Sequence, residues 1–430
     1  MLSAFAAAFR TPDLRKKLLF TFGIIGLFRL GSVIPSPGVS YTAIHTCINQ
    51  VQDNSVYGLI NLFSGGALLQ LSVFALGIMP YITSSIIIQL LTVVIPRLES
   101  LKKEGQSGNA KITQYTRYLT VGLAILQSTT IITLARTPGR LFQGCNEELM
   151  PNQSLPLLLT LVCIMTAGTA LIMWLGELVT DRGVGNGMSI LIFTSVISTF
   201  PGQLASIWKI DGSLKFLITL AIGALTIAAV VYVEQAQRRI PVQYAKRQIG
   251  RRQYGGTSTY LPLKVNQAGV IPVIFASSLL YLPDLVVQLT NSQAGWAQWV
   301  LTYMAPGRSA YLALNFLLIV FFTYFYVSIT FNPDEISDNM KQYGGFIPGI
   351  RAGKPTADYL AYVLSRITFP GSLYLALIAT IPYIAFDQLG VGKRFLFGGT
   401  SLLIMVGVGL DTVKQIESQL QQRNYEGFLK

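Results

Sequence analysis

The chain has 430 residues, of which 51% are apolar and only 12% are charged. An ordinary soluble domain carries about twice that share of charged residues, so a water-soluble fold is excluded. Disordered, collagen-like and small disulfide-rich chains are excluded by the same composition. The net charge of +13 favours nucleic acid or a membrane surface as a partner. A single His and three Cys provide no cluster suited to a metal or redox centre.

Ten apolar runs are long enough to cross a bilayer as helices, because a hydrocarbon core of about 30 Å requires about 20 residues. The sequence therefore predicts an all-α polytopic membrane protein with both termini on the same side. The predicted spans cover residues 17–36, 71–95, 114–135, 155–176, 187–208, 214–233, 268–289, 309–331, 367–386 and 395–413.

Most of the 32 Lys and Arg residues fall in loops on the side of the N-terminus. This bias predicts that both termini are cytosolic. The most basic of these loops, residues 234–267, has short alternating segments around a glycine-containing tip, which predicts a β-hairpin. In the loop 332–366, Asn332 and Pro333 predict the cap and the first residue of a short helix.

The apolar segment Tyr57–Leu68 is too short to cross the bilayer and is broken by Gly65 and Gly66. Irregular backbone at membrane depth must be surrounded by protein or by a water-filled cavity, so this segment indicates a cavity. Pro80 and Pro272 interrupt spans two and seven at matching places, and small hydroxyl residues follow both.

Matching interruptions predict two five-helix halves of inverted topology. The two halves would be residues 1–208, with spans one to five, and 209–430, with spans six to ten and both large cytosolic loops.

Catalytic signatures are missing from the sequence. The string Gly349–Pro355 has the wrong spacing for a phosphate-binding loop, and the only His, His45, falls in an external loop. Three carboxylates, Glu177, Glu234 and Asp411, fall at cytosolic span ends, where caps or interface anchors are expected. A pore therefore fits better than an ion-coupled pump or an enzyme.

Arg29 is the one charged residue well inside a span. Snorkelling to the interface, or pairing with a polar neighbour, is favoured over contact with a substrate.

Several long strings resemble the SecY family of bacterial protein-translocation channels, from about residue 10 to the end of the chain. They are LGIMPYITSSIIIQLL (76–91), FSGGALLQLSVF (63–74), GELVTDRGVGNGMSILIF (176–193), LPLKVNQAGVIPVIFASS (261–278), FIPGIRAGKPT (346–356) and FGGTSLLIMVGVGLDT (397–412). The resemblance implies a channel for unfolded secretory polypeptides that also releases apolar segments sideways into lipid.

The same resemblance implies an hourglass pore whose external funnel is closed by a plug, and the broken segment 57–68 matches it. Its residues include Tyr57, Leu59, Ile60, Asn61, Leu62, Phe63, Ser64, Gly65 and Gly66. The resemblance also implies that the pore has a constriction formed by a ring of aliphatic side chains, which would disfavour water and ions when empty. This constriction maps onto Ile78, Ile82, Met188, Ile192, Ile274 and Ile404. Re-entrant filling by the plug segment and ordinary helix packing by the ring residues remain the alternatives.

A lateral gate between spans two and seven is also implied. Its candidate contacts are Thr83, Ser85, Gln89, Ser277 and Ser278. Each hydroxyl could equally bond back onto its own helix.

The basic hairpin and the loop 332–366 resemble docking elements, with candidates Lys246, Arg251, Arg252 and Arg351. Membrane-surface adhesion is the alternative for part of this charge. The resemblance implies SecE, SecG, SecA, the ribosome and signal-bearing preproteins as partners in the bacterial cytoplasmic membrane. It implies no cofactor.

Two other classes remain as rivals, a secondary transporter and a non-conducting membrane scaffold. Cys47 and Cys145 are both expected outside the membrane, and the sequence leaves open whether they pair. Cys163 is expected to pack within span four.

Overall fold

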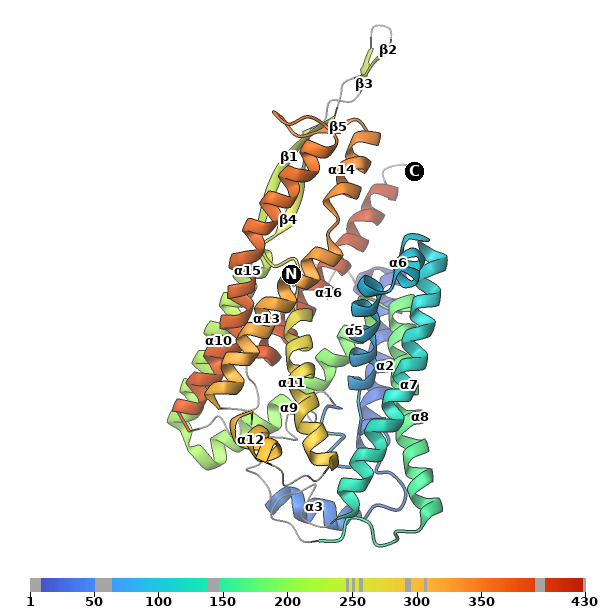
Figure 1. The fold of residues 1–430 in the computed structure, drawn as a ribbon, viewed down its shortest axis with the longest axis vertical. Helices are drawn as coiled ribbons and strands as arrows, with labels where there is room; N and C mark the ends of the chain where they lie inside the picture. The colour runs from blue at the N-terminus through green and yellow to red at the C-terminus, as the bar shows by residue number, and fades with distance from the viewer. Residues whose placement is uncertain are drawn as a thin grey trace.

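The computed structural model describes residues 9–50, 64–137, 147–244, 247–249, 252–254, 258–290, 295–304, 308–390 and 399–427. Long helices run side by side, a β-hairpin extends beyond one end, and short helices lie near the other end (Figure 1). The helices are α2 (Pro12–Val33), α3 (Tyr41–Gln50), α5 (Met79–Val94), α6 (Pro96–Lys103), α7 (Gln106–Arg136), α8 (Leu155–Arg182), α9 (Gly187–Asp211), α10 (Ser213–Gln235), α11 (Ile271–Thr290), α12 (Gly295–Tyr303), α13 (Ser309–Thr330), α14 (Pro333–Gln342), α15 (Lys354–Gln388) and α16 (Gly399–Gly427).

Each of the ten predicted spans overlaps a helix in the described part of the chain. Within the described residues, six helices are long and apolar enough to cross a membrane: α7, α8, α9, α10, α13 and α15. A seventh is counted if α5 and α6, which are bent by 100° at Ile95, form one span. The remaining predicted spans are occupied by α2, α11 and α16.

Span two was predicted to be helical from residue 71, which is wrong for its first eight residues. Residues 64–78 form turns, and α5 begins only at Met79. Leu71 and Gly77 have positive φ angles of 45° and 56°, which an α-helix does not accept. This segment instead pairs with the extended chain after α2, where Ser36 N donates to Leu71 O at 3.1 Å and Val73 N donates to Ile34 O at 3.1 Å.

The helices pack as two groups. Contacts join α2, α5, α7, α8 and α9 to one another, and contacts also join α10, α11, α13, α15 and α16. The groups meet where α9 packs against α10 and α16, and again where α5 meets α11 with fewer contacts. In Figure 1 the first group, apart from α9, lies to the right and the second to the left.

The predicted β-hairpin is confirmed. Strands β1 (Gln237–Tyr244) and β4 (Ser258–Lys264) pair antiparallel, with Gln237 opposite Lys264. At the tip, β2 (Arg247–Ile249) pairs with β3 (Arg252–Tyr254). Strand β5 (Gly345–Phe346), from the loop after α14, joins the edge of β1. The two large basic loops therefore form one structure, which the sequence did not reveal.

The short helix after Asn332 is also confirmed, with Pro333 in its first turn. Asn332 occupies the cap position, but its side chain makes no capping hydrogen bond.

The cysteines differ from expectation in one respect. Cys163 is exposed on α8 and free, so the prediction that it packs inside the protein is wrong. Cys47, on α3, is buried and forms a disulfide, whereas Cys145 lies outside the described residues.

Substitution of Gly168 on α8 tests the packing of the turn segment. A Cβ atom at Gly168 would overlap the backbone oxygen of Val73. Gly168→Ala should therefore lower the unfolding free energy by about 1 to 3 kcal/mol, as overpacking in protein interiors does. Thermal unfolding of the purified protein in detergent measures the change. Gly122→Ala on α7 is the matched control, because nothing lies within 4 Å of its added methyl group. Equal unfolding temperatures for the two variants would contradict the close approach.

Candidate functional site

An open cavity of about 470 Å³ lies between the two helix groups. Its walls come from α5, α7, α8, α9 and α11, so it touches both groups beside the α5–α11 contact. It is lined by Tyr81, Ile82, Ser85, Ile86, Gln89, Thr113, Arg117, Glu177, Thr180, Asp181, Asn186, Met188, Ser189, Ile192, Ile271, Ile274 and Phe275.

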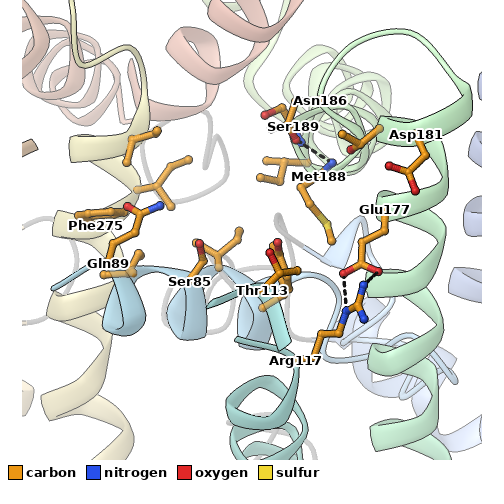
Figure 2. Close-up of a pocket in the computed structure, with 17 residues that line it drawn as sticks. Ser85, Gln89, Thr113, Arg117, Glu177, Asp181, Asn186, Met188, Ser189 and Phe275 are labelled. Atoms are coloured by element: carbon orange, nitrogen blue, oxygen red, sulfur yellow. Dashed lines mark hydrogen bonds and ion pairs between the residues drawn. The ribbon is translucent and has the colours of Figure 1, made fainter. Parts of the chain in front are cut away.

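The walls of this cavity differ in polarity. Figure 2 shows Arg117, Glu177 and Asp181 on one side and Phe275 with Gln89 across from them. The α11 wall is apolar, with Ile271, Ile274 and Phe275. The α5 wall is mixed, because Ser85 and Gln89 line the cavity together with Ile82 and Ile86.

An ion pair holds the polar wall together. Arg117 Nε donates to Glu177 Oε1 at 2.9 Å, and Arg117 Nη2 donates to Glu177 Oε2 at 2.8 Å. This two-bond geometry fixes the orientation of both side chains and joins α7 to α8. Glu177 was predicted to be a cap or interface anchor, and its role here is to bind a neighbouring helix.

The start of α9 is fixed beside this ion pair. The Asn186 side chain accepts hydrogen bonds from Met188 N at 3.1 Å and Ser189 N at 3.3 Å, which caps the helix. Met188 and Ile192 follow four residues apart on one face of α9 and both line the cavity.

The six predicted ring residues lie in or against one hydrophobic cluster. Ile78, Ile82, Ile192, Ile274 and Ile404 are buried members, and Met188 packs against them. Four of the six, Ile82, Met188, Ile192 and Ile274, also line the cavity, whereas Ile78 and Ile404 do not. Ile86, Ile271 and Phe275 line the same cavity and were missed by the sequence analysis.

The candidate gate residues behave in two ways. Thr83 Oγ1 donates to Met79 O at 3.0 Å, and Ser277 Oγ donates to Ile274 O at 3.0 Å, so these two bond back to their own helices. Ser85 and Gln89 line the cavity. Ser278 is buried, and its hydroxyl has no partner among the described residues.

The described part of the predicted plug begins at Ser64, and Tyr57 to Phe63 lie outside the described residues. Ser64 is fully buried, and its hydroxyl accepts a hydrogen bond from Leu68 N at 3.1 Å. Gly65 and Gly66 both have positive φ angles, of 67° and 93°. Gly65 lies between α2 and α9, because its carbonyl accepts from Arg29 Nη1 and a Cβ atom there would lie 3.3 Å from Ser195 Cα.

The family model for SecY matches residues 72–413 of the chain. The chain belongs to the SecY family. It is 65% identical to the protein translocase subunit SecY of Streptomyces scabiei, over the full length of both chains. It is 60% identical to the SecY subunit of Mycobacterium tuberculosis, again over the full length of both.

Solved structures share this SecY fold at lower identity. A structure of a protein-conducting channel matches with a TM-score of 0.65 and 18% identity, covering 94% of this chain and 91% of that one. A SecY structure described in terms of the plug domain, which stabilises the closed state of that channel, matches with a TM-score of 0.63 and 18% identity, at the same coverage.

The remaining two carboxylates noted in the sequence, Glu234 and Asp411, lie near the base of the β-hairpin. Asn266 Nδ2 donates to Glu234 Oε1 at 2.5 Å and to Gly269 O at 3.1 Å, just before α11 begins. Lys264 at the end of β4 lies 3.5 Å from Asp411 on α16. These contacts attach the base of the hairpin and the start of α11 to the second helix group.

Arg351 is the one docking candidate whose side chain the structure describes. It is exposed on a turn between Gly349 and Gly353, which have φ angles of 84° and 101°. Ser337 Oγ donates to Gly353 O at 2.6 Å and Thr356 Oγ1 donates to Arg351 O at 2.8 Å, so α14 and α15 fix the turn. Lys246 and Arg251 lie outside the described residues, and Arg252 begins β3.

The described residues contain no group of His, Cys, Asp and Glu side chains arranged to hold a metal ion.

Charge reversal tests the ion pair on the polar wall. Arg117→Glu should lower the unfolding free energy by about 1 kcal/mol, because it places like charges together at a partly exposed site. The double variant Arg117→Glu with Glu177→Arg should recover most of this loss in thermal unfolding. Lys111→Glu is the control, because Lys111 and Glu104 are exposed and 4.0 Å apart. A double variant no more stable than Arg117→Glu would show that the pair does not join the helices.

Proposed function

We propose that this chain is the channel subunit of a bacterial protein translocase. It conducts unfolded secretory polypeptides across the cytoplasmic membrane and releases apolar segments of membrane proteins sideways into the bilayer. The observation that carries this proposal is the cluster of aliphatic side chains from α5, α9, α11 and α16 at the junction of the two helix groups, with the cavity leading to it.

An aliphatic constriction suits a channel whose cargo has no fixed sequence. Ile and Met side chains make no hydrogen bonds that a passing polypeptide would have to satisfy. An apolar constriction also excludes ions and water when no polypeptide fills it. We assign this role to Ile78, Ile82, Met188, Ile192, Ile274 and Ile404.

The lateral gate is proposed to be the α5–α11 contact. Apolar side chains of α11, together with Ile82 and Ile86 of α5, line the cavity beside this contact. The contact is smaller than the packing of α5 on α7 or of α11 on α13. Thr83 and Ser277 bond to their own helices, so few polar bonds have to break when the two helices separate. We propose that an apolar signal segment entering the cavity takes the place of this contact.

The two helix groups are proposed to be the moving halves. Residues 1–208 and 209–430 divide the chain close to the break between α9 and α10 at Gly212. The contacts of α9 with α10 and α16 would act as the hinge opposite the gate.

The hairpin, α14 and the Arg351 turn are proposed to lie on the cytosolic side, with both termini. The excess of Lys and Arg in these loops supports this orientation. The chain has no nucleotide-binding loop, so a partner must supply the energy. The proposed partners are SecE, SecG, the ATPase SecA and the ribosome. A similar channel, Sec61, has been solved in a canine ribosome-channel complex, with a TM-score of 0.60.

Cross-linking to a translocating chain tests the channel proposal. A photoreactive amino acid at Ile82 or Ile274 avoids removing Cys47, which is disulfide-bonded. In vesicles containing the complete translocase, the probe should cross-link to a stalled secretory substrate only when its signal sequence is functional and the motor is energised. The control position is Ile125, which is exposed on the outer face of α7. Export without a cross-link at either ring position would reject the ring assignment.

Shortening the ring side chains should open a leak. Ile82→Gly and Ile274→Gly should each increase the ion conductance of resting vesicles, because the apolar constriction widens. A non-conducting scaffold predicts no change in conductance or in export. Saturable uptake of a small solute would instead favour a transporter.

Arg351→Ala should weaken binding of the motor or ribosome in a salt-dependent way, since a charge contact is lost. Binding of purified partners to vesicles over a salt series measures the effect. Lys341→Ala, which removes an exposed charge near the end of α14, is the control. Equal salt dependence for both variants would remove Arg351 from the docking surface.

A further inference from the structure

Arg29 lies inside α2, near its external end, and reaches the backbone of the predicted plug. Its Nη1 atom donates to Gly65 O at 2.6 Å and lies 3.5 Å from Ser32 Oγ. The expectation that Arg29 pairs with a polar neighbour is confirmed, and this neighbour is a backbone carbonyl 36 residues away in the sequence.

No carboxylate forms an ion pair with Arg29 among the described residues. A charged side chain at membrane depth is retained only where polar groups compensate for its lost hydration. Here Gly65 O and Ser32 Oγ provide that compensation. The charge therefore depends on the plug segment remaining in place.

The surroundings of Gly65 fix the position of the carbonyl that accepts the Arg29 hydrogen bond. Gly65 has a φ of 67°, and a Cβ atom there would lie 3.2 Å from Ser198 Oγ and 3.3 Å from Ser195 Cα. Ser198 Oγ lies 3.5 Å from Gly65 O, and its hydroxyl donates to Ser195 O at 2.8 Å. The Gly65 carbonyl thus lies between α2 and α9 and accepts its short hydrogen bond from Arg29, and a side chain at position 65 would push it away from both helices.

The residues around Arg29 hold the continuation of the same segment. Phe28 is fully buried and stacks on Phe74 with ring centroids 6.0 Å apart. A Cβ atom at Gly31 would overlap the Phe74 ring. One face of α2 therefore packs against both ends of the turn segment 64–78.

We propose that Arg29 is a latch that holds the base of the plug, Ser64 to Gly66, against α2 and α9 while the channel is closed. This inference rests on the proposed function and adds a positioning residue to it. An arginine suits this role because a charged donor makes a strong hydrogen bond to a carbonyl, and the planar guanidinium can reach Gly65 O and Ser32 Oγ together. Opening the plug must break this bond.

The test uses the complete translocase in vesicles and measures two quantities. The first is ion conductance in the absence of substrate, and the second is export of preproteins with functional and with defective signal sequences. Arg29→Gln should raise resting conductance roughly tenfold or more, because a hydrogen bond to a charged group contributes at least that factor to an equilibrium. It should also permit export of the preprotein with the defective signal. Arg29→Lys, which keeps the charge, should lie between Arg29→Gln and the unmodified protein.

Gly65→Ala tests the acceptor without removing the charge, so it also covers the case in which Arg29→Gln folds poorly. It should reproduce the higher conductance. The controls are Arg15→Gln, an exposed arginine of the same helix, and Gly26→Ala, where nothing lies within 4 Å of the added methyl group. Both controls should match the unmodified protein.

The outcomes separate the latch from the channel. Normal export with unchanged resting conductance in both Arg29→Gln and Gly65→Ala would overturn the latch and leave the channel intact. Higher conductance in Arg29→Gln alone, with Gly65→Ala silent, would assign closure to the charge itself and would also overturn it. Failure of the unmodified complex to export any preprotein would instead reject the proposed function.

Discussion

Backbone polar groups cannot remain unpaired in hydrocarbon. In this chain the constraint applies most strongly to the non-helical segment 64–78, and it determines how the first helix group packs around that segment. Short turns pair part of its backbone internally, as where Ser72 N donates to Ala67 O at 3.1 Å, and other amides and carbonyls find partners outside the segment. The chain after α2 supplies hydrogen bonds to Leu71 and Val73, Arg29 supplies one to Gly65, and α8 approaches so closely at Gly168 that only a glycine fits. The first helix group is in effect a protein enclosure for this irregular backbone. A channel needs such an enclosure to keep a removable stopper at membrane depth.

The contacts between helices are distributed unequally within and between the two helix groups. Helices within each group pack extensively, and α9 connects the two groups on one side, whereas α5 and α11 meet over a small contact on the other. The Arg117–Glu177 pair fixes α7 to α8, and the Glu234–Asn266 bond fixes the start of α11 to the end of α10. Polar bonds therefore stiffen each group, and apolar side chains form the boundary between them. Apolar contacts are non-directional, so this boundary can exchange one apolar neighbour for another.

The sequence was sufficient for whatever depends on local composition. Apolar run lengths located a helix at every predicted span, alternation located the β1–β4 hairpin, and Asn332 with Pro333 located α14. Prediction from the sequence failed where contacts with residues far away in the chain determine the conformation. Residues 71–78 are apolar enough for a span, but pairing with the chain after α2 holds them in turns. The Arg117–Glu177 and Arg29–Gly65 contacts join residues 60 and 36 positions apart, and no periodicity reports such a contact. For the site, family resemblance chose six residues that do cluster, but it missed Ile86, Ile271 and Phe275 on the cavity wall.

The Arg29 contact also bears on how the chain is made. α2 leaves the ribosome before Gly65 does, so its arginine enters the membrane without its carbonyl partner. An arginine at the centre of a membrane-spanning helix costs about 2.5 to 3.5 kcal/mol on insertion scales, and the cost is lower toward a helix end, where Arg29 lies. Until residues 64–66 are made, the Gly65 carbonyl cannot offset this cost. The packing of α2 is therefore completed only when a later part of the chain has folded against it.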